Sequence, residues 1–261
     1  MNPIGMGEQS EEQRHRFEAE AIGIVENASH VDVTLRLLGS LAFHIHCPRY
    51  GSLQRELGRA YTDLDFAAYG AQASRISPLL ATMGYKEDLE VNTYFAGKRM
   101  IFHHPKNGIH IDIFLDELDF CHTIHWAHRL EKDSPTIPLA ELLLEKMQIV
   151  KINEKDVIDT MMLLLEHPLG DQDSETINIA LISHLCAQDW GLWRTVTMNL
   201  GKVAQLAKNY PQITPPDLSR IQLQVEKALN TINATPKSLA WKVRSRVGDR
   251  VKWYQDVDDV I

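Results

Sequence analysis

Hydrophobic positions in the first half of the chain alternate between a helical period and a strand period. Apolar residues at helical spacing predict a helix near residues 10–28, with a capping-box pattern that begins at Ser10. A short apolar run over residues 32–38 then predicts a strand that ends at Gly39. Ser40 is a good N-cap for the apolar helical segment that follows. The chain therefore begins with a helix, a strand and a second helix.

The same pattern predicts four further strands and one helix before about residue 120. Residues 62–69 have strand character, and residues 74–85 have helical periodicity. Residues 92–104 have the pattern of two strands joined by a turn. Asn107-Gly108 is a hairpin signal, and residues 109–117 form a strand with alternate isoleucines on one face. These elements are typical of a mixed sheet with flanking helices.

Beyond about residue 130 the hydrophobic pattern becomes helical throughout. Pro135 and Pro138 mark a linker, and the residues after them contain no convincing strand. Proline-containing turns divide this half into about six helices, which is typical of a bundle. We therefore predict an α+β fold in residues 1–130, with a mixed sheet and flanking helices, followed by an all-α helical domain in residues 131–261.

Composition narrows the class of protein. The 261 residues are 44% hydrophobic and 24% charged, which are ordinary values for a folded protein. No apolar run reaches the roughly 20 residues that span a bilayer, and the N-terminal residues lack the basic start and apolar middle of a signal peptide. We therefore expect a cytoplasmic protein with no membrane partner. Three widely spaced cysteines argue against a disulfide framework.

The distribution of charge bears on nucleic-acid binding. A formal net charge of -8 argues against strong nonspecific binding to DNA, because such binding depends on Lys and Arg. Residues 236–252 are locally basic, with six Lys or Arg residues against one Asp. This stretch is either a solvated helix face or a contact for RNA or another polyanion.

Aspartates on two predicted strands are the main chemical signal. Residues two apart in a strand project from the same face, so Asp63 and Asp65 share a face while Leu64 and Phe66 face the core. Asp112 likewise points away from the isoleucine face of its strand. If the two strands are neighbours, three carboxylates converge on one surface. Such a surface suits Mg²⁺, or Mn²⁺, together with the phosphates of a nucleotide.

Gly39-Ser40 adds a phosphate-binding element, because backbone N–H groups at a helix start bind phosphate and a glycine permits close approach. In chain order, Gly39-Ser40, the segment TDLDF from Thr62 and the triplet around Asp112 resemble the DNA polymerase beta type nucleotidyltransferase superfamily. Arg59, three residues before Thr62, makes the pattern most similar to the branch that contains abortive-infection-type toxin nucleotidyltransferases.

The resemblance spans roughly residues 30–165 and implies an enzyme. In the toxin branch a lysine and a Lys-Asp-x-x-Asp element follow in a helical region, and Lys146 and residues 155–159 match them here. The implied reaction is metal-dependent transfer of a nucleoside monophosphate from an NTP to an unidentified acceptor, which is RNA, protein or a small molecule. Asp63, Asp65 and Asp112 would be catalytic and would hold the metal, with Asp112 also deprotonating the acceptor hydroxyl. Residues implied in nucleotide binding are Gly39, Ser40, Lys146, Lys155 and Asp156.

Other interpretations of these residues stay open. The same fold without chemistry would be a nucleotide-binding or partner-binding module. Residues 155–159 also fit a charged helix face with pairing along the helix. Half of the 12 histidines lie in residues 103–128, and Cys121, His125 and His128 would share a face of a helix, which would suit zinc. Three further acidic residues near Asp112 could take its place, namely Asp116, Glu117 and Asp119.

Overall fold

The computed structural model describes residues 11–58, 60–95 and 97–257, so Ser10 and Arg59 lie outside the described residues. The chain divides into two compact units. Unit 1 contains the described residues up to Ile45, Gln54–Leu118 and His125–Pro138. Unit 2 contains His46–Leu53, Asp119–Ile124 and the described residues from Leu139 onward.

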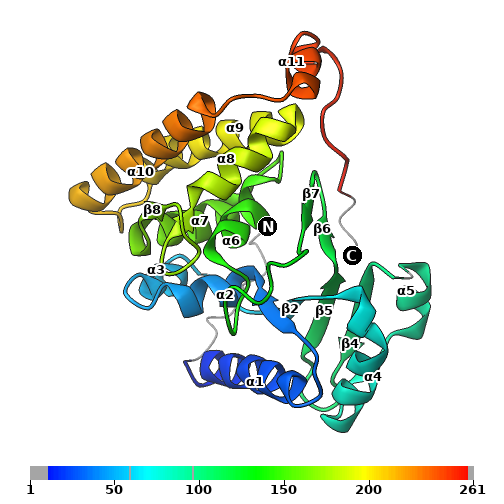
Figure 1. The fold of residues 1–261 in the computed structure, drawn as a ribbon. Helices are drawn as coiled ribbons and strands as arrows, with labels where there is room; N and C mark the ends of the chain where they lie inside the picture. The colour runs from blue at the N-terminus through cyan, green and yellow to red at the C-terminus, as the bar shows by residue number, and fades with distance from the viewer. Residues whose placement is uncertain (1–10, 59, 96, 258–261) are drawn as a thin grey trace, which may run out of the picture. The chain divides into compact units, whose positions relative to one another are not determined.

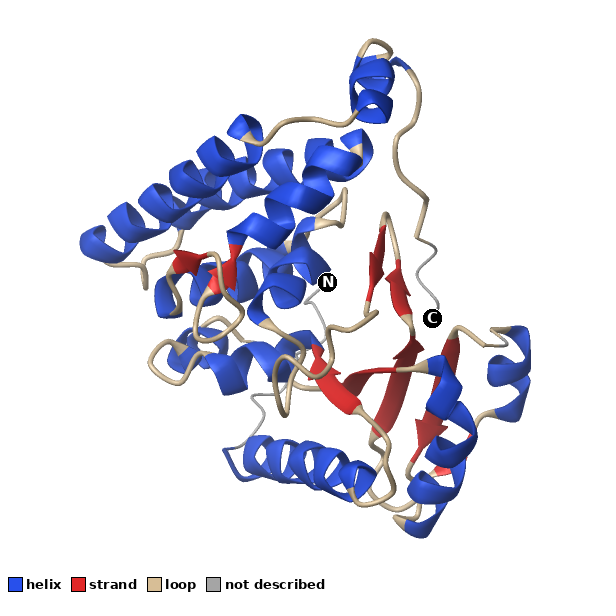
Figure 2. Ribbon diagram, in the orientation of Figure 1, coloured by secondary structure: helices blue, strands red, loops and turns tan. Residues whose placement is uncertain are grey.

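A five-stranded mixed sheet of order β1-β2-β5-β4-β3 is the centre of unit 1 (Figure 2). β2 and β5 run parallel, and the other neighbouring strands are antiparallel. The predicted hairpin at Asn107-Gly108 joins β4 to β5, and Gly108 has a φ of +71°, which this turn requires. The strands are β1 Leu35–Leu38, β2 Asp63–Ala68, β3 Lys86–Glu87, β4 Arg99–His103 and β5 His110–Leu115.

One face of this sheet forms the core of unit 1. Alternate residues of β2 and β5 are fully buried there, among them Leu64, Phe66, Ile111 and Ile113. Helix α1 contacts β1, and α4 contacts β3 (Figure 1). The opposite face carries the aspartates, so the predicted α+β fold is confirmed together with its polar sheet face. Helices that lie wholly in unit 1 are α1 Glu11–Ser29, α4 Ala73–Thr82 and α5 Leu89–Tyr94.

Two local predictions in unit 1 need correction. The prediction of two strands over residues 92–104 is wrong for the first of them, because Leu89–Tyr94 is the helix α5. Asp88 caps this helix by accepting a hydrogen bond from Val91 N at 3.1 Å. Helix α2, Gly39–His46, begins two residues earlier than expected, so Ser40 lies in its first turn and is not its N-cap.

Unit 2 is mostly helical. From Leu139 onward the described residues form six α-helices, in agreement with the number predicted. The expectation of no strand is wrong in detail, because β8 Leu169–Gly170 and β9 Ile177–Asn178 pair in parallel. These strands have two residues each, which is too short for a detectable alternation. The helices are α6 Leu139–Met147, α7 Glu154–Glu166, α8 Ile179–Gln188, α9 Trp190–Leu206, α10 Pro215–Ala234 and α11 Leu239–Ser245.

Three further short elements belong to the described structure. Helix α3, Gly51–Glu56, follows α2, and the strands β6 Glu117–Asp119 and β7 Thr123–His125 form a two-stranded sheet. None of the described helices has both the length and the apolar composition needed to cross a membrane.

Candidate functional site

Strand pairing brings together Asp63, Asp65 and Asp112 of unit 1, which we call the sheet carboxylates. In the parallel pair β2 and β5, Asp65 lies directly beside Asp112. Asp63 lies two residues before Asp65 and projects from the same face. Asp63 is exposed, while Asp65 and Asp112 are partly buried. The condition stated from the sequence, that the two strands be neighbours, is met in the structure.

The turn from β1 into α2 places Gly39 against the sheet carboxylates. β1 pairs with β2 so that Leu38 lies opposite Asp65. Gly39 follows with a φ of +74°, and a Cβ at this position would overlap Oδ2 of Asp65. Glycine is therefore required twice, by its backbone conformation and by the nearby carboxylate. The first turn of α2 begins beside the aspartates, as a phosphate-binding element would need.

A buried glutamine holds the backbone of this turn. The carbonyl oxygen of Ser40 accepts a hydrogen bond from Nε2 of Gln54 at 3.0 Å. Oε1 of Gln54 accepts in turn from the Tyr61 hydroxyl at 3.0 Å. Gln54 is fully buried, so these bonds are shielded from competition with water. They link α2 to the residues just before β2.

Arg99 is a member of the site that the sequence analysis did not single out. Its Nε donates to Oδ1 of Asp112 at 2.6 Å, and its terminal nitrogen donates to Oδ2. The two side chains are 22% and 14% exposed. The hairpin register could have predicted this pair, because Ile101 lies opposite Asp112 and Arg99 is two residues away on the same face.

Burial and charge act against each other at Asp112. Burial raises its pKa above the ordinary value, the Arg99 guanidinium lowers it, and the neighbouring charge of Asp63 raises it further. The hydrogen bonds to Asp112 raise the pKa of Arg99, and the charge of Asp65 adds to this effect. Arg99 therefore stays charged and serves as a counter-ion to the sheet carboxylates.

The sheet carboxylates fit a divalent cation only in part as they stand. Their donors are all carboxylate oxygens, which is the type of ligand that Mg²⁺ prefers. Asp63 and Asp65 can face one cation from a single strand. Both oxygens of Asp112, however, are hydrogen-bonded to Arg99. Consistent with this, the described part of the chain has no group of three His, Cys, Asp or Glu side chains placed to hold a metal ion.

The acidic residues considered as substitutes for Asp112 have local partners. Oδ1 of Asp116 accepts from Gly70 N at 3.0 Å, in a turn where Asp116 has a φ of 62°. Glu117 pairs with Lys98 at 3.3 Å. Asp119 accepts from the Thr123 hydroxyl at 2.7 Å. Each of these carboxylates stabilises a turn or a strand end, so Asp112 remains the best candidate for the third position.

The structure removes the basis of the zinc interpretation. Residues 117–128 form two short strands and turns, so Cys121, His125 and His128 do not share a helical face. His122 lies instead in unit 2, where its Nε2 is 2.8 Å from Oγ1 of Thr195, and burial lowers its pKa below the ordinary value. His122 is therefore a neutral core residue near neutral pH.

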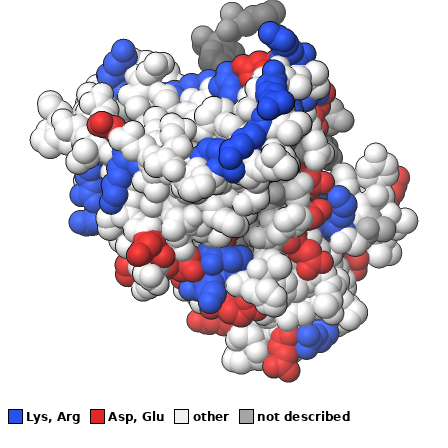
Figure 3. Space-filling model, turned by 45° about the horizontal axis from the view of Figure 1, so that its top comes forward, with Lys and Arg blue, Asp and Glu red and all other residues white. Residues whose placement is uncertain are grey.

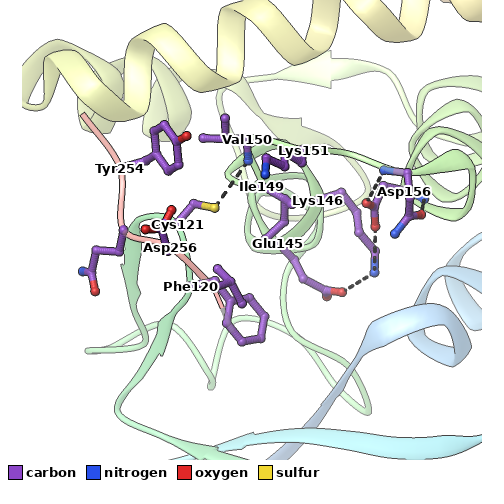
Figure 4. A pocket seen from close by; sticks show the side chains of 13 residues that line it. Phe120, Cys121, Glu145, Lys146, Ile149, Val150, Lys151, Asp156, Tyr254 and Asp256 are labelled. Atoms are coloured by element: carbon purple, nitrogen blue, oxygen red, sulfur yellow. Dashed lines mark hydrogen bonds and ion pairs between the residues drawn. The ribbon is translucent and has the colours of Figure 1, made fainter. Parts of the chain in front are cut away.

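Lys146, predicted to contact the triphosphate, lies in unit 2 among three carboxylates. Its Nζ is 2.7 Å from Glu145 and 4.0 Å from Asp156 (Figure 4). It is also 3.7 Å from Asp159. Its side chain is only 12% exposed, and Asp159 is fully buried. Burial alone would lower the pKa of Lys146, but the three carboxylates together raise it above the ordinary lysine value. We call these four residues the Lys146 cluster.

Asp156 also has a structural role, as the third residue of a capping box. Its carboxylate accepts from Asn153 N at 3.0 Å, and the Asn153 side chain accepts from Asp156 N at 3.1 Å. These bonds fix the start of α7 and turn Asp156 toward α6. Lys155 beside it is exposed. The structure thus brings Lys146 and Asp156 together and leaves Lys155 on the surface.

A cavity of about 490 Å³ in unit 2 adjoins the Lys146 cluster. Figure 4 shows aromatic side chains from two different segments, Phe120 and Tyr254, around it. Lys151 adds a second cation to its wall, and Asp256 adds a further carboxylate. The cavity therefore combines stacking surfaces with both signs of charge, and the sequence analysis did not predict it. No periodic signal links Phe120 to Tyr254, because they are distant in the chain.

The basic stretch at residues 236–252 is only partly available for a partner. Arg244 donates to the carbonyl oxygens of Gly248 and Val251 at 2.8 and 2.7 Å, so it stabilises its own segment. Lys242, Arg246 and Arg250 are exposed. Figure 3 shows Lys and Arg side chains gathered in the upper part of the face it draws. The choice between a solvated surface and a polyanion contact stays a prediction.

Comparison with known proteins found structures of nucleotidyltransferases. No family model and no curated protein matches the chain. Lincosamide antibiotic adenylyltransferase LnuA, lincomycin-bound, is 18% identical, and the match covers 56% of this chain and 95% of that one with a TM-score of 0.41. Antibiotic-resistance factor ANT(2'')-Ia is 11% identical, with 66% and 94% covered and a TM-score of 0.40.

A third similar structure is terminal uridylyl transferase 4 from Trypanosoma brucei with bound GTP. It is 11% identical, the match covers 83% of this chain and 91% of that one, and the TM-score is 0.28. All three are nucleotidyltransferases, the superfamily that the sequence motifs resemble. The toxin branch of the resemblance stays a prediction.

Proposed function

We propose that this protein is a nucleotidyltransferase that transfers a nucleoside monophosphate from an NTP to an acceptor hydroxyl. The observation that carries the proposal is the register of β2 and β5, which puts Asp65 beside Asp112 with Asp63 on the same face. The turn at Gly39 supports it, because a helix start lies against the same carboxylates. Motif order along the chain and strand order in the sheet thus agree.

The residues of unit 1 have distinct roles in this reaction. The acceptor oxygen attacks the α-phosphorus, the bond from that phosphorus to the bridging oxygen of the β-phosphate breaks, and pyrophosphate leaves with that oxygen. The acceptor proton passes to the Asp112 carboxylate, which must first separate from Arg99. Gly39 and the Ser40 hydroxyl would bind the phosphates. Asp63, Asp65 and the released Asp112 would hold Mg²⁺ or Mn²⁺, which when bound offsets the charge of the triphosphate.

The residues of unit 2 have less direct assignments. Lys146 and Asp156 stay proposed as nucleotide contacts, because both line the cavity of unit 2 and would meet a nucleotide there without exchange of the ion pairs in the Lys146 cluster. Lys155 is proposed to reach the triphosphate from its exposed position. The acceptor is not assigned, and RNA, protein and small molecules all remain candidates.

Transfer of label from α-labelled NTPs tests the proposal. The acceptors to be screened are transfer RNA, lysate protein, aminoglycosides and lincomycin, the ligand in one of the similar structures. We expect label to appear in one acceptor class with Mg²⁺, to disappear with EDTA, and to disappear in Asp63→Asn. Label that persists in Asp63→Asn, or that does not respond to EDTA, would contradict this mechanism.

A second candidate is a module that binds nucleotides without transferring them. The Arg99–Asp112 ion pair favours it, because a chain that never releases Asp112 has no base for the acceptor proton. Nucleotide binding that depends on Mg²⁺, without transfer to any acceptor in the panel, would support this candidate over the enzyme.

A further inference from the structure

Arg99 donates two hydrogen bonds to Asp112, the third carboxylate of the proposed site. The guanidinium donates through Nε and a terminal nitrogen to the two different oxygens of Asp112. A carboxylate that accepts both arms of an arginine has few lone pairs left for a cation. In this state Asp112 cannot join Asp63 and Asp65 as a full ligand.

Ring contacts hold the guanidinium at the surface of the sheet. Its central carbon lies 5.4 Å from the ring centre of Phe95 and 5.3 Å from that of Phe114. Such contacts favour a cation near both rings and do not depend on Asp112. Arg99 is also partly exposed, at 22% of its side chain. The guanidinium can therefore break its hydrogen bonds to Asp112 while it stays against the two rings.

The charge balance identifies what would replace this ion pair. Without Arg99, three carboxylates would face one another on one surface and repel. A divalent cation removes the same repulsion, so it can take the place of Arg99 at Asp112. The freed guanidinium then needs an anion close to Asp63 and Asp65. A phosphate meets that need, because its oxygens match the planar fork as well as a carboxylate does.

We propose that Arg99 is a displaceable counter-ion that competes with a divalent cation for Asp112 and, once displaced, binds a phosphate of the nucleotide. This inference rests on the proposed function. It explains how unit 1 stays stable without a cation. It also predicts that metal and nucleotide bind cooperatively, since each supplies one of the two partners that exchange.

Mn²⁺ binding in the absence of nucleotide, measured by electron paramagnetic resonance, tests the competition between Arg99 and the cation for Asp112. We expect Arg99→Gln to bind Mn²⁺ about tenfold more tightly than the native chain, because the competitor for Asp112 is gone. The gain should vanish in the double variant Arg99→Gln with Asp112→Asn. Lys98→Gln is the matched control, since Lys98 is the preceding residue and pairs with Glu117, and it should not change Mn²⁺ affinity.

Binding of ATP at saturating Mn²⁺ tests the contact between the displaced Arg99 and a phosphate of the nucleotide. We expect Arg99→Gln to weaken ATP binding about tenfold, so that one substitution changes metal and nucleotide affinity in opposite directions. Arg99→Lys keeps the charge and should recover part of the ATP affinity. Arg99→Lys also tests the competition if Arg99→Gln does not fold. Lysine is a single-point donor and holds Asp112 less firmly than the arginine fork, so this variant should still bind Mn²⁺ more tightly than the native chain.

The outcomes separate this inference from the proposed function. Equal or weaker Mn²⁺ affinity in both Arg99 variants overturns the competition. A Mn²⁺ gain with unchanged ATP affinity overturns the phosphate contact. If folded native protein and folded Arg99 variants all fail to bind Mn²⁺ at millimolar concentration, the metal site itself is wrong, and both proposals fail.

Discussion

The sheet carboxylates and the Lys146 cluster contain the same kinds of groups in different surroundings. Each combines three carboxylates with one cation, so each has an excess of negative charge. In unit 1, Asp63 is exposed and Arg99 reaches solvent. In unit 2, Asp159 is fully buried and Lys146 is 12% exposed. Access to water is therefore the property that separates the two clusters.

This difference determines what each cluster can do. In unit 1, water reaches Asp63 and Arg99 and can solvate these charges while partners exchange, so the pair of Arg99 with Asp112 is replaceable. In the interior, removing one partner leaves uncompensated charge that water cannot reach. The same residue types thus make a site with exchangeable partners in unit 1 and a cluster that stabilises the fold in unit 2. A sequence motif that contains Asp and Lys does not distinguish these cases.

The largest effect is expected on catalysis at the sheet carboxylates. Asp112→Asn removes the proton acceptor, so transfer should fall by about 10²–10⁴-fold while NTP binding falls less. Labelled transfer and NTP titration measure the two effects. Asp65→Asn should instead abolish the Mg²⁺ dependence of binding. If both variants retain NTP affinity and transfer, these aspartates have only a structural role. The difference proposed between the sheet carboxylates and the Lys146 cluster would then not hold.

Removing the cation of the Lys146 cluster should give the next largest effect. Lys146→Met leaves three carboxylates without their partner and should lower the free energy of unfolding by about 3–5 kcal/mol. Urea denaturation measures this value. The exposed Lys155 supplies the control, because Lys155→Met should change stability by less than about 0.5 kcal/mol. Equal losses of stability in the two variants would show that the Lys146 cluster does not stabilise unit 2.

The pH dependence of that loss follows from the raised pKa of Lys146. The lysine contributes stability in its charged form, which is fully present below the ordinary lysine pKa of 10.5 and is lost only as pH rises through the raised value. Urea denaturation of Lys146→Met and native protein at several pH values checks this. The part of the difference in free energy of unfolding that comes from the charge of Lys146 should stay constant from about pH 6 to about pH 9.

A smaller effect is expected at the glycine that borders Asp65. Gly39→Ala and Gly108→Ala both place an alanine at a positive φ, +74° and +71°, which costs about 1–2 kcal/mol. Only Gly39→Ala also forces a Cβ against the Asp65 carboxylate, while a Cβ at Gly108 meets no atom within 4 Å. Thermal unfolding should therefore show a larger loss for Gly39→Ala. Equal losses would mean that Asp65 moves freely away from α2.

The smallest effect is expected at Ser40. Removing its hydroxyl takes one donor from the proposed phosphate site, so NTP binding should weaken by about 1 kcal/mol, or roughly fivefold. The melting temperature should stay the same, because the contact with Gln54 uses the carbonyl oxygen of Ser40. Calorimetric titration checks the first point. An unchanged dissociation constant would limit Ser40 to the geometry of the helix start.

Local patterns predicted most of unit 1 for identifiable reasons. The strand around Asp63 follows from the period of two in residues 62–69, and the hairpin follows from Asn107-Gly108, whose backbone preferences act within a few residues. The error at Leu89–Tyr94 has the same origin. Apolar and aromatic residues there resemble a strand, but the segment is a helix whose first turn is stabilised by a capping bond to Asp88.

The amino-acid pattern alone thus settled which aspartates share a strand face, where the hairpin turns and that the second half is helical, because each depends on neighbours within a few positions. Only the folded chain decided that β2 lies beside β5 with Asp65 at Asp112, that Arg99 occupies Asp112, and that Lys146 is enclosed while Lys155 is exposed. These facts depend on which distant segments pack together. Burial, which sets the strength of every charge pair here, exists only after that packing.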